Sequence, residues 1–593
     1  MILINRNIQV LRGVSVLFVV FFHLESPYFK FGYLGVDVFF LISGFLIPII
    51  IHKYNAITFF KARVKRLAPA LSIIVLITII FGYFINMPGE YYNISESALY
   101  SLFFISPFYF LNNTGYFDQN SLLQPLLHTW SLGNEFFAYI IVSFFLILGR
   151  GKYLRILSDL TASILFIVFT FLLYKGEVDY LNPIPRMFLF FLAFSVSFRF
   201  NLDKKNIPSN KNLSIISIIS LCILIFFFKD DISSHLWPSI SIFLLPSTVI
   251  PLMLIRCDII PINKLQDYFI KLGDYSYAVY LVHWPVIVFE RTYFRNLNIS
   301  LNETFILLII IIISSWTLRR FFEKYEAKTK YIYILTIASC IFVFENEGIK
   351  DRVPKGFVKY SSLEKMTNEK FYLERVQYTK FNYDVVSESN KNYGILVIGD
   401  SHSQHIIPII KSSFLGNIYR IRLDEYDLNE NIEEVLKFIE LKGITQVLVA
   451  YRISTKNPNM LISSIKGLNS QKKAHIYVMR DIPSFKGDPV ACLLSQESKL
   501  LFKGCDFNII KGIPLNGILN YSDPVWSKVS MMANNNSISF IDSHGYLCGK
   551  KCSVFINNEL IMRDSNHLNE RLSNETNEIL FNLLLKDALQ NKK

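Results

Sequence analysis

Long apolar stretches follow one another through the first 345 residues, separated by short polar segments. Because a transmembrane helix needs about 20 mainly apolar residues, this pattern predicts a multi-span α-helical membrane domain over residues 1–330 and an additional helix over 331–345. The expected spans lie near residues 8–25, 34–52, 68–86, 132–149, 160–174, 186–199, 213–228, 237–255, 275–291, 304–318 and 331–345. Pro107 breaks a further apolar stretch, 97–111, which we expect to be re-entrant or interfacial.

The pattern changes after the last of these stretches. Residues 346–392 are polar with little periodicity, and we expect a linker or extension there. From residue 393 apolar runs alternate with amphipathic stretches, which predicts an α/β sandwich domain with a largely parallel sheet over 393–593. The expected strands are 393–399, 445–451, 475–479 and 538–542, and the clearest amphipathic stretches are 429–442 and 569–589.

Composition and charge agree with a membrane protein. Of the 593 residues, 52% are hydrophobic and 15% aromatic, which is too apolar for one soluble globule. With the N-terminus inside, 22 Lys and Arg residues lie on the inner side and five on the outer side. This is the positive-inside pattern, so the net charge of +13 needs no nucleic-acid partner. Because the number of expected spans is odd, eleven, residues 346–593 are expected on the outer side of the membrane.

Four of the seven cysteines lie in the polar C-terminal part, and their short spacing predicts two disulfides in an oxidising compartment. The expected pairs are Cys492–Cys505 and Cys548–Cys552. A zinc site is the competing interpretation, but no His lies at ligand spacing beside either pair, so we expect no metal.

The first span carries two ionisable residues, Arg12 and His23, eleven positions apart. At about 3.6 residues per turn and 1.5 Å rise, they share one helix face and lie roughly 16 Å apart along the axis. Ionisable residues within a membrane helix usually face the bundle interior or an aqueous path. The alternative is an Arg that extends to the interface and a His at the outer end of the helix.

Two short motifs at the ends of the C-terminal domain point to nucleophilic chemistry. Ser401 stands directly after a predicted strand, where its hydroxyl is exposed and backbone N–H groups lie nearby. Asp564 precedes His567 by three residues, so the carboxylate can orient the imidazole as general base for the serine. Each motif alone is weak, but together they predict a Ser–His–Asp hydrolase-type site.

On these motifs the domain resembles the SGNH hydrolase family, which implies Ser401 as nucleophile, Asp564 and His567 as its partners, and the Ser401 N–H as an oxyanion donor. Gly416 is the candidate for the family's glycine block. The third block falls near residues 447–454, where Arg452 stands in place of Gly-x-Asn. SGNH domains fused to membrane acyltransferases are similar in this respect and in the spacing of Cys548 and Cys552.

The membrane part resembles the transmembrane acyltransferase-3 family over roughly residues 5–325. Five separated motifs carry the resemblance: Arg12-x10-His23, residues 35–45 (GVDVFFLISGF), 60–69 (FKARVKRLAP), 129–135 (TWSLGNE) and 275–285 (YSYAVYLVHWP).

The resemblance and the expected topology together assign roles. His23 is expected to take the proton of a sugar hydroxyl, and an outer carboxylate, Glu135 or Asp37, to hold its tautomer. We expect Arg63, Arg66 and Arg12 to bind the phosphorylated acyl donor. Substrate-binding or structural roles are expected for Asp37, Trp130, Ser131, His283 and Arg452.

The combined prediction is an O-acyltransferase, in particular an O-acetyltransferase, in a bacterial inner membrane with its C-terminal domain outside. The resemblance implies acetyl-CoA as cytoplasmic donor, no permanently bound cofactor, and a surface polysaccharide such as lipopolysaccharide O-antigen, or a lipid-linked glycan, as acceptor. Peptidoglycan O-acetylation is the nearest alternative. A transporter or flippase with an attached esterase also fits paired intramembrane charges. A structural membrane anchor for a secreted esterase does not explain Arg12, His23 and Glu135.

Overall fold

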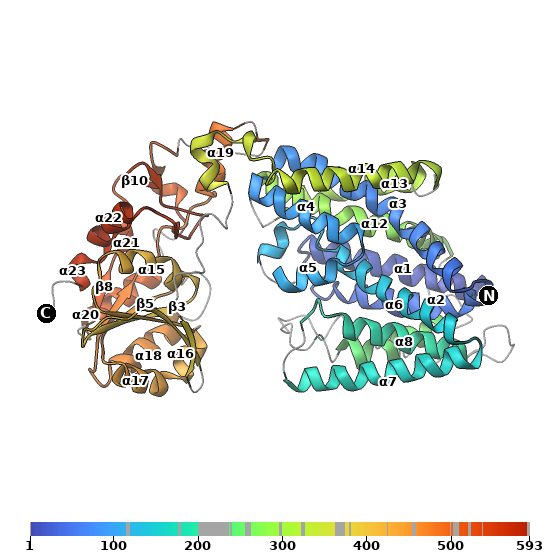
Figure 1. Ribbon diagram of the computed structural model, residues 1–593, viewed down its shortest axis with the longest axis horizontal. Coiled ribbons are helices and arrows are strands. Elements are labelled where there is room, and N and C mark those ends of the chain that lie inside the picture. Colours follow the sequence, from blue (N-terminus) through green and yellow to red (C-terminus); the bar gives the residue numbers. More distant parts are fainter. Residues whose placement is uncertain are drawn as a thin grey trace. The chain divides into compact units, whose positions relative to one another are not determined.

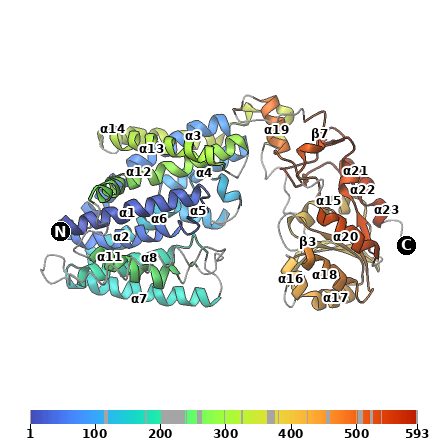
Figure 2. The ribbon, with the colours of Figure 1, turned by 180° about the vertical axis from the view of Figure 1, so that it is seen from behind.

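The computed structural model describes the greater part of the chain, and the described residues form two compact units (Figures 1 and 2). We call residues Met1–Asn86 and Glu90–Ile349 the membrane unit, and Met87–Gly89 with Lys350–Lys593 the α/β unit. The description covers residues 2–113, 119–175, 179–199, 237, 240–254, 263–295, 299–321, 326–361, 374–378, 381–423, 425–452, 458–498, 500–501, 509–519, 524–535 and 538–589. The expected span 213–228 and Cys505 lie outside these residues.

The membrane unit is a bundle of helices, as the apolar stretches predict. Its helices are α1 (Ile2–His23), α2 (Leu34–Ile50), α3 (Ala56–Ile85), α4 (Pro88–Leu102), α5 (Ser106–Asn113), α6 (Thr129–Leu148), α7 (Lys152–Lys175), α8 (Pro183–Arg199), α11 (Leu245–Leu254), α12 (Asn263–Phe294), α13 (Leu301–Phe321) and α14 (Glu326–Glu345). Among the described residues, five helical segments are long and apolar enough to cross a membrane: 34–53, 56–85, 129–148, 152–175 and 301–321.

Small residues let the helices that carry the ionisable motifs approach closely. A Cβ added to Gly273 of α12 would lie 2.0 Å from the carbonyl oxygen of Gln9 in α1, and one added to Gly13 would lie 2.4 Å from the Phe269 carbonyl oxygen. Such close backbone contact is the usual function of glycine between membrane helices. It fixes α1 against α12 and thereby brings His23 near the late-helix motif.

The stretch 97–111 is interrupted as expected, although before Pro107. Helix α4 ends at Leu102, and Phe104 has a positive φ of 59°. Helix α5 then begins at Ser106 with Pro107 in its first turn, where a proline is tolerated because no intrahelical donor is lost.

A seven-stranded mixed sheet forms the centre of the α/β unit, in the order β1-β2-β4-β3-β5-β6-β8. Strands β3 to β8 of this sheet are parallel, whereas β1 and β2 pair antiparallel at one edge. The strands are β1 (Glu374–Tyr378), β2 (Phe381–Ser387), β3 (Gly394–Gly399), β4 (Asn417–Arg422), β5 (Ile444–Ala450), β6 (His475–Met479) and β8 (Ser539–Ile541). Short pairs join β7 (Ile513–Pro514) to β9 (Lys551–Cys552) and β10 (Phe555–Ile556) to β11 (Glu559–Leu560).

Helices cover both faces of this sheet (Figure 1). In β3, Ile395 and Val397 pack in the core with α15 and α22, whereas Leu396 and Ile398 pack on the opposite face. The strand is therefore buried on both sides, which explains its continuous apolar run. The helices are α15 (Ser401–Ser413), α16 (Glu425–Glu430), α17 (Ile432–Leu441), α18 (Pro458–Asn469), α19 (Pro489–Glu497), α20 (Pro524–Asn535), α21 (Ser543–Leu547), α22 (Asn574–Leu584) and α23 (Lys586–Leu589).

The sheet extends further along the sequence than the pattern predicts. Strands β1 and β2 lie within 346–392, which we expected to be a linker or extension, and β4 was not predicted. These strands mix apolar residues with charged ones. Their charges are tolerated in the sheet because Arg420 of β4 and Asp384 of β2 form a buried ion pair across it, at 3.2 Å. A local hydrophobic pattern does not reveal a charge that is neutralised by a distant residue.

The structure contains a disulfide between Cys548 and Cys552. Cys492 is also disulfide-bonded, while Cys505 lies outside the described residues. Groups of His, Cys, Asp and Glu able to hold a metal ion are absent from the part of the chain that the structure describes.

Candidate active sites

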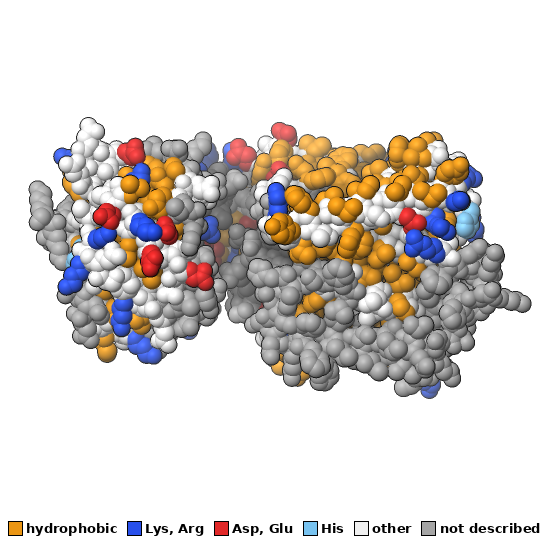
Figure 3. Space-filling model, turned by 90° about the horizontal axis from the view of Figure 1, so that it is seen from below, with side chains coloured by type: hydrophobic (Ala, Val, Ile, Leu, Met, Phe, Trp, Pro, Cys, Tyr) orange, Lys and Arg blue, Asp and Glu red, His pale blue; other side chains and the backbone are white. Residues whose placement is uncertain are grey.

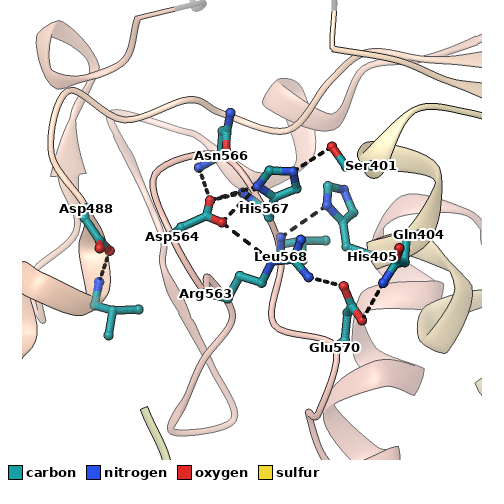
Figure 4. Close-up of polar contacts among 11 residues, drawn as sticks. Ser401, Gln404, His405, Asp488, Arg563, Asp564, Asn566, His567, Leu568 and Glu570 are labelled. Carbon is teal, nitrogen blue, oxygen red and sulfur yellow. Dashed lines mark hydrogen bonds and ion pairs between the residues drawn. The ribbon is translucent and has the colours of Figure 1, made fainter. Parts of the chain in front are cut away.

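Ser401, His567 and Asp564 lie together in the α/β unit (Figure 4). The Ser401 hydroxyl is 2.9 Å from Nε2 of His567, and Nδ1 of His567 is 2.9 Å from Oδ2 of Asp564. Ser401 is the first residue of α15, so its N–H belongs to the helix N-terminus, where amides lack intrahelical partners. The arrangement can deprotonate the serine and stabilise an oxyanion.

The Asp564 carboxylate is held in its charged form. Burial raises its pKa, but hydrogen bonds from His567 and from the Asn566 N–H, with the charge of Arg563, outweigh burial and lower the pKa from 3.8 to about 2. A carboxylate that stays ionised orients the neutral imidazole and stabilises the imidazolium that forms when His567 takes a proton.

Two further imidazoles pack against the base. The rings of His402 and His405 lie 4.9 and 5.6 Å from that of His567. Burial, together with nearby positive groups, lowers the pKa of both well below the ordinary value of 6.5. They therefore stay neutral near pH 7 and surround the base without adding charge.

The turn that presents Ser401 is tightly specified. Gly399 has φ 159°, and a Cβ there would lie 1.8 Å from the carbonyl oxygen of Ala450, so a side chain is excluded. Asp400 caps α15 by accepting from the His402 N–H at 2.8 Å, and its other carboxylate oxygen accepts from the Arg452 N–H at 3.1 Å. The ends of β3 and β5 are thereby fastened to each other.

Arg452 contacts the loop that carries the base. In the orientation of the Asn566 amide that satisfies both of its ends, the amide oxygen accepts from Arg452 Nη1 at 2.7 Å and the nitrogen donates to Asp564 Oδ1 at 2.9 Å. Gly416 is not near this edge: it precedes β4, whose Asn417 pairs with Gly394 at the amino end of the sheet. The expectation that Gly416 supplies the family's glycine block is therefore wrong. Gly416 lies just before the start of β4, whereas Ser401 lies after the end of β3, at the opposite edge of the sheet.

A buried carboxylate links the two halves of this site. Glu570, 1% exposed, accepts from Gln404 Nε2 at 3.3 Å and from the guanidinium of Arg563 (Figure 4). Gln404 lies one turn after Ser401 on α15, and Arg563 adjoins Asp564. Glu570 thus connects the nucleophile helix to the base loop. Sequence reasoning missed it, because its partners are brought together only by the fold.

In the membrane unit, a cavity of about 250 Å³ lies between α1, α2, α3, α6 and α12. Arg12, Arg63 and Arg66 line it together with Glu135. Glu135 accepts from the Ser43 hydroxyl at 2.6 Å and from the Tyr139 hydroxyl. Three guanidinium groups against one carboxylate make the cavity suited to an anionic ligand.

His23 is held by another histidine. Its Nδ1 lies 3.1 Å from Nε2 of His283, whose Nδ1 faces the carbonyl oxygen of Tyr280 at 2.7 Å. A carbonyl only accepts, so Nδ1 of neutral His283 carries the proton and its Nε2 accepts from His23 Nδ1–H. His23 is then the Nδ1–H tautomer, and its Nε2 carries the lone pair that a general base requires.

Neither expected carboxylate takes this place beside His23. Asp37 is fully buried and accepts from Arg186 Nε, Trp237 Nε1 and the Ser241 hydroxyl, at 2.9 to 3.0 Å. Arg186 in turn lies against the rings of Trp130, Tyr180 and Trp237. Asp37 is therefore engaged in a buried ion pair, and Trp130 belongs to the aromatic walls around it. An arginine within an apolar helix was the signal that could have revealed Arg186.

Ser131 and Tyr280 lie between the cavity and the histidines. Both line the cavity, and their hydroxyls are 2.7 Å apart. The ring of Tyr280 is 5.5 Å from that of His283, and its carbonyl oxygen is the acceptor of His283. The arginine-lined cavity and His23 are consequently neighbouring parts of one polar region inside the helix bundle.

The chain matches known families along most of its length. Residues 5–320 match the acyltransferase domain family, and residues 371–579, which include β1 and β2, match the SGNH domain fused to AT3 domains. The O-acetyltransferase OatA of Staphylococcus aureus is 26% identical over 342 residues, which cover 53% of this chain and 55% of OatA. The match thus spans about half the length of this relative.

Other relatives cover different shares. The putative O-acetyltransferase SAR0937 of S. aureus is 24% identical over 72% of each chain, and the putative membrane-bound transacylase BcsY of Komagataeibacter xylinus is 27% identical over 48% of this chain and 73% of its own. The periplasmic domain of a lipopolysaccharide acetyltransferase from Salmonella ser. Paratyphi A covers 33% of this chain and 83% of its own, with TM-score 0.26 and 17% identity. Because the first family match alone covers more than half of the residues, the chain belongs to the acyltransferase family, with a fused SGNH domain.

Proposed function

We propose that the protein is an O-acetyltransferase that transfers an acetyl group from cytoplasmic acetyl-CoA to a hydroxyl group of a bacterial surface polysaccharide. The observation that carries the proposal is the pairing of an arginine-lined cavity with a histidine whose basic nitrogen is fixed by a second histidine. Arg12, Arg63 and Arg66 would hold the phosphates of the donor, and His23 would act on the hydroxyl or thioester group.

The α/β unit supports a covalent step. Ser401 Oγ attacks the acyl carbonyl while His567 Nε2 takes its proton; the tetrahedral intermediate expels the donor group, which leaves with that proton. A glycan hydroxyl then attacks acyl-Ser401, its proton passes to His567, and collapse returns the proton to Ser401. We propose this relay for Ser401, with Asp564 holding the tautomer of His567.

The acceptor that we propose is lipopolysaccharide O-antigen, reached from the periplasmic side of the inner membrane. Peptidoglycan is the second candidate acceptor, and the same two sites would serve it. Structural analysis of both glycans in wild-type and deletion strains decides between them, because the acetyl ester disappears from the true acceptor alone. Complementation with His23→Ala, at matched protein abundance in the membrane, should not restore the ester. Restoration of the ester by that variant would contradict the role proposed for His23.

A transporter with an attached esterase is the alternative from another class. Its expected signature is movement of a glycan carrier without use of acyl donor. Inverted vesicles with labelled acetyl-CoA distinguish the two functions: an acetyltransferase consumes the donor in proportion to the ester formed, whereas a transporter leaves it intact.

A further inference from the structure

A second cavity, of about 670 Å³, is lined by residues of the membrane unit, and neither His23 nor His283 is among them. Helices α3, α6 and α14 and the break after α4 border it, and its walls include Phe60, Phe103, Phe104 and Phe136. We call it the lateral groove. Figure 3 shows how hydrophobic side chains cover much of the described face of this unit, with basic side chains gathered towards one end.

Two lysines, Lys65 and Lys330, line the lateral groove. Thr336 of α14 donates to the Ser72 carbonyl oxygen of α3 at 3.3 Å. The helices run in the same direction, since residues 79–84 of α3 share a pocket with residues 338–343 of α14. Lys65 and Lys330 each precede that contact by about two turns, so they lie at one level, at one end of the groove.

The groove and the arginine-lined cavity lie back to back. On α3, Arg63 and Arg66 line the cavity, while Val64 and Lys65 line the groove. On α6, Glu135 faces the cavity and Phe136 the groove. A molecule in the groove therefore contacts the reverse side of the two helices that carry the charged residues of the candidate donor site.

We propose that the lateral groove binds an anionic glycerophospholipid, with its phosphate at Lys65 and Lys330 and an acyl chain along the phenylalanine walls. The chemistry matches such a lipid at both ends: cations at one level for the head group, and an aromatic apolar surface for the chain. Both lysines belong to segments that the charge pattern places on the inner side, which favours an inner-leaflet phospholipid over a lipid-linked glycan awaiting acylation outside.

Thermal unfolding of the purified full chain in neutral detergent tests this site. Phosphatidylglycerol should raise the unfolding midpoint by preferential binding to the folded state, and phosphatidylcholine at the same concentration should raise it less. The double variant Lys65→Gln/Lys330→Gln should lose the difference between the two lipids. Loss of two lysine charges beside an anionic lipid should raise the dissociation constant for phosphatidylglycerol roughly 30-fold. Native mass spectrometry can measure this change.

Lys53→Gln/Lys61→Gln is the matched control, because it removes two exposed lysines of the same basic segment that do not line the groove. It should keep the preference for phosphatidylglycerol, as should Lys65→Arg/Lys330→Arg, which retains both charges. Equal loss in the control would show general surface attraction and overturn the site. Equal stabilisation of wild type by both lipids, or preferential binding of a polyprenyl phosphate, would overturn the proposed ligand.

Discussion

His23 in the membrane unit and His567 in the α/β unit are both held through Nδ1, but by different partners. Asp564 holds His567 with an ionised carboxylate, whereas His283 holds His23 with a neutral imidazole nitrogen. Each partner selects the tautomer that leaves Nε2 basic. Only the carboxylate also stabilises the imidazolium that forms after proton transfer.

The difference follows from where each site lies. An isolated carboxylate inside a helix bundle is costly unless it is paired, and the two carboxylates that we expected beside His23 are engaged elsewhere: Asp37 with Arg186, and Glu135 with Ser43 and Tyr139. A neutral imidazole orients its neighbour without a net charge. We infer that the membrane site suits a proton transfer concerted with acyl transfer, and the α/β site a longer-lived charged intermediate.

The largest expected effect comes from removing a central residue of either site. If the acyl group passes through both in series, His23→Ala and Ser401→Ala each stop product formation, and the double variant is no worse than a single one. Labelled acetyl-CoA, followed by analysis of the glycan, measures this. Ser412→Ala, which removes another serine of α15, is the matched control and should leave acylation unchanged.

The same experiment can break the series arrangement. If the membrane unit acylates the glycan directly, Ser401→Ala retains substantial acylation while His23→Ala does not. Mass spectrometry of the α/β unit, with acceptor withheld, then finds no label on Ser401. Label on Ser401 that disappears in His567→Ala is the outcome expected of the relay.

Asp564→Asn should have the next largest effect. The amide preserves the shape but favours the wrong tautomer of His567 and no longer stabilises the imidazolium. By analogy with serine hydrolase triads, the loss in the rate of Ser401 acylation is roughly 10⁴-fold. Rapid-quench measurement of label on Ser401 checks it. A loss below tenfold would mean that the charge of Asp564 is not used.

Substitution of His283 tests how His23 is held in the membrane unit, and its expected effect on the rate is smaller. In His283→Gln the amide oxygen can still accept from His23 Nδ1–H, whereas in His283→Phe the ring volume remains without an acceptor. We expect His283→Phe to lower kcat by roughly 10² to 10⁴, the range of general-base catalysis, and His283→Gln to recover much of it. Equal losses in both variants, with unchanged KM, would show that His283 acts through packing rather than through tautomer control.

The sequence revealed the triad of the α/β unit more readily than the residues around it. Asp564 and His567 are three residues apart and Ser401 follows an apolar strand, so local spacing was sufficient. Glu570 was missed because it joins Arg563 to Gln404, which lies 166 residues away, and the pair Asp384–Arg420 was missed because 36 residues separate its members. The edge strands β1 and β2 were missed because polar and charged residues interrupt their apolar ones, so neither strand shows the continuous apolar run of β3.

The membrane site shows the same limit more sharply. The spacing of Arg12 and His23 marked one helix face, yet the partner of His23 lies 260 residues further on. The expected position across the membrane alone suggested Glu135 and Asp37 as neighbours of His23, because all three are expected at a similar depth. Depth does not fix the direction of a side chain around its helix, and in the structure Glu135 faces the arginine-lined cavity while Asp37 faces Arg186.

The smallest expected effect is on the stability of the α/β unit. It arises from the charge of the Asp564 carboxylate, which has no counterpart beside His23. The pKa of Asp564 is lowered from 3.8 to about 2 in the folded protein, so its ionised form stabilises the fold above pH 4. A shift of this size corresponds to roughly 2 kcal/mol at neutral pH. That contribution declines as the pH falls from about 4 to about 2, because the folded state then takes up the proton that the unfolded state already holds.

Asp564→Asn should therefore destabilise the α/β unit at pH 7, and the difference from wild type should shrink towards pH 2. Chemical unfolding of the full chain, followed by circular dichroism, measures both. Glu578→Gln on α22 is the control, since this exposed carboxylate should change stability by no more than about 0.5 kcal/mol. A difference that stayed constant with pH would assign the effect to lost packing or to strain, and the carboxylate of Asp564 would then not be the charged partner that distinguishes His567 from His23.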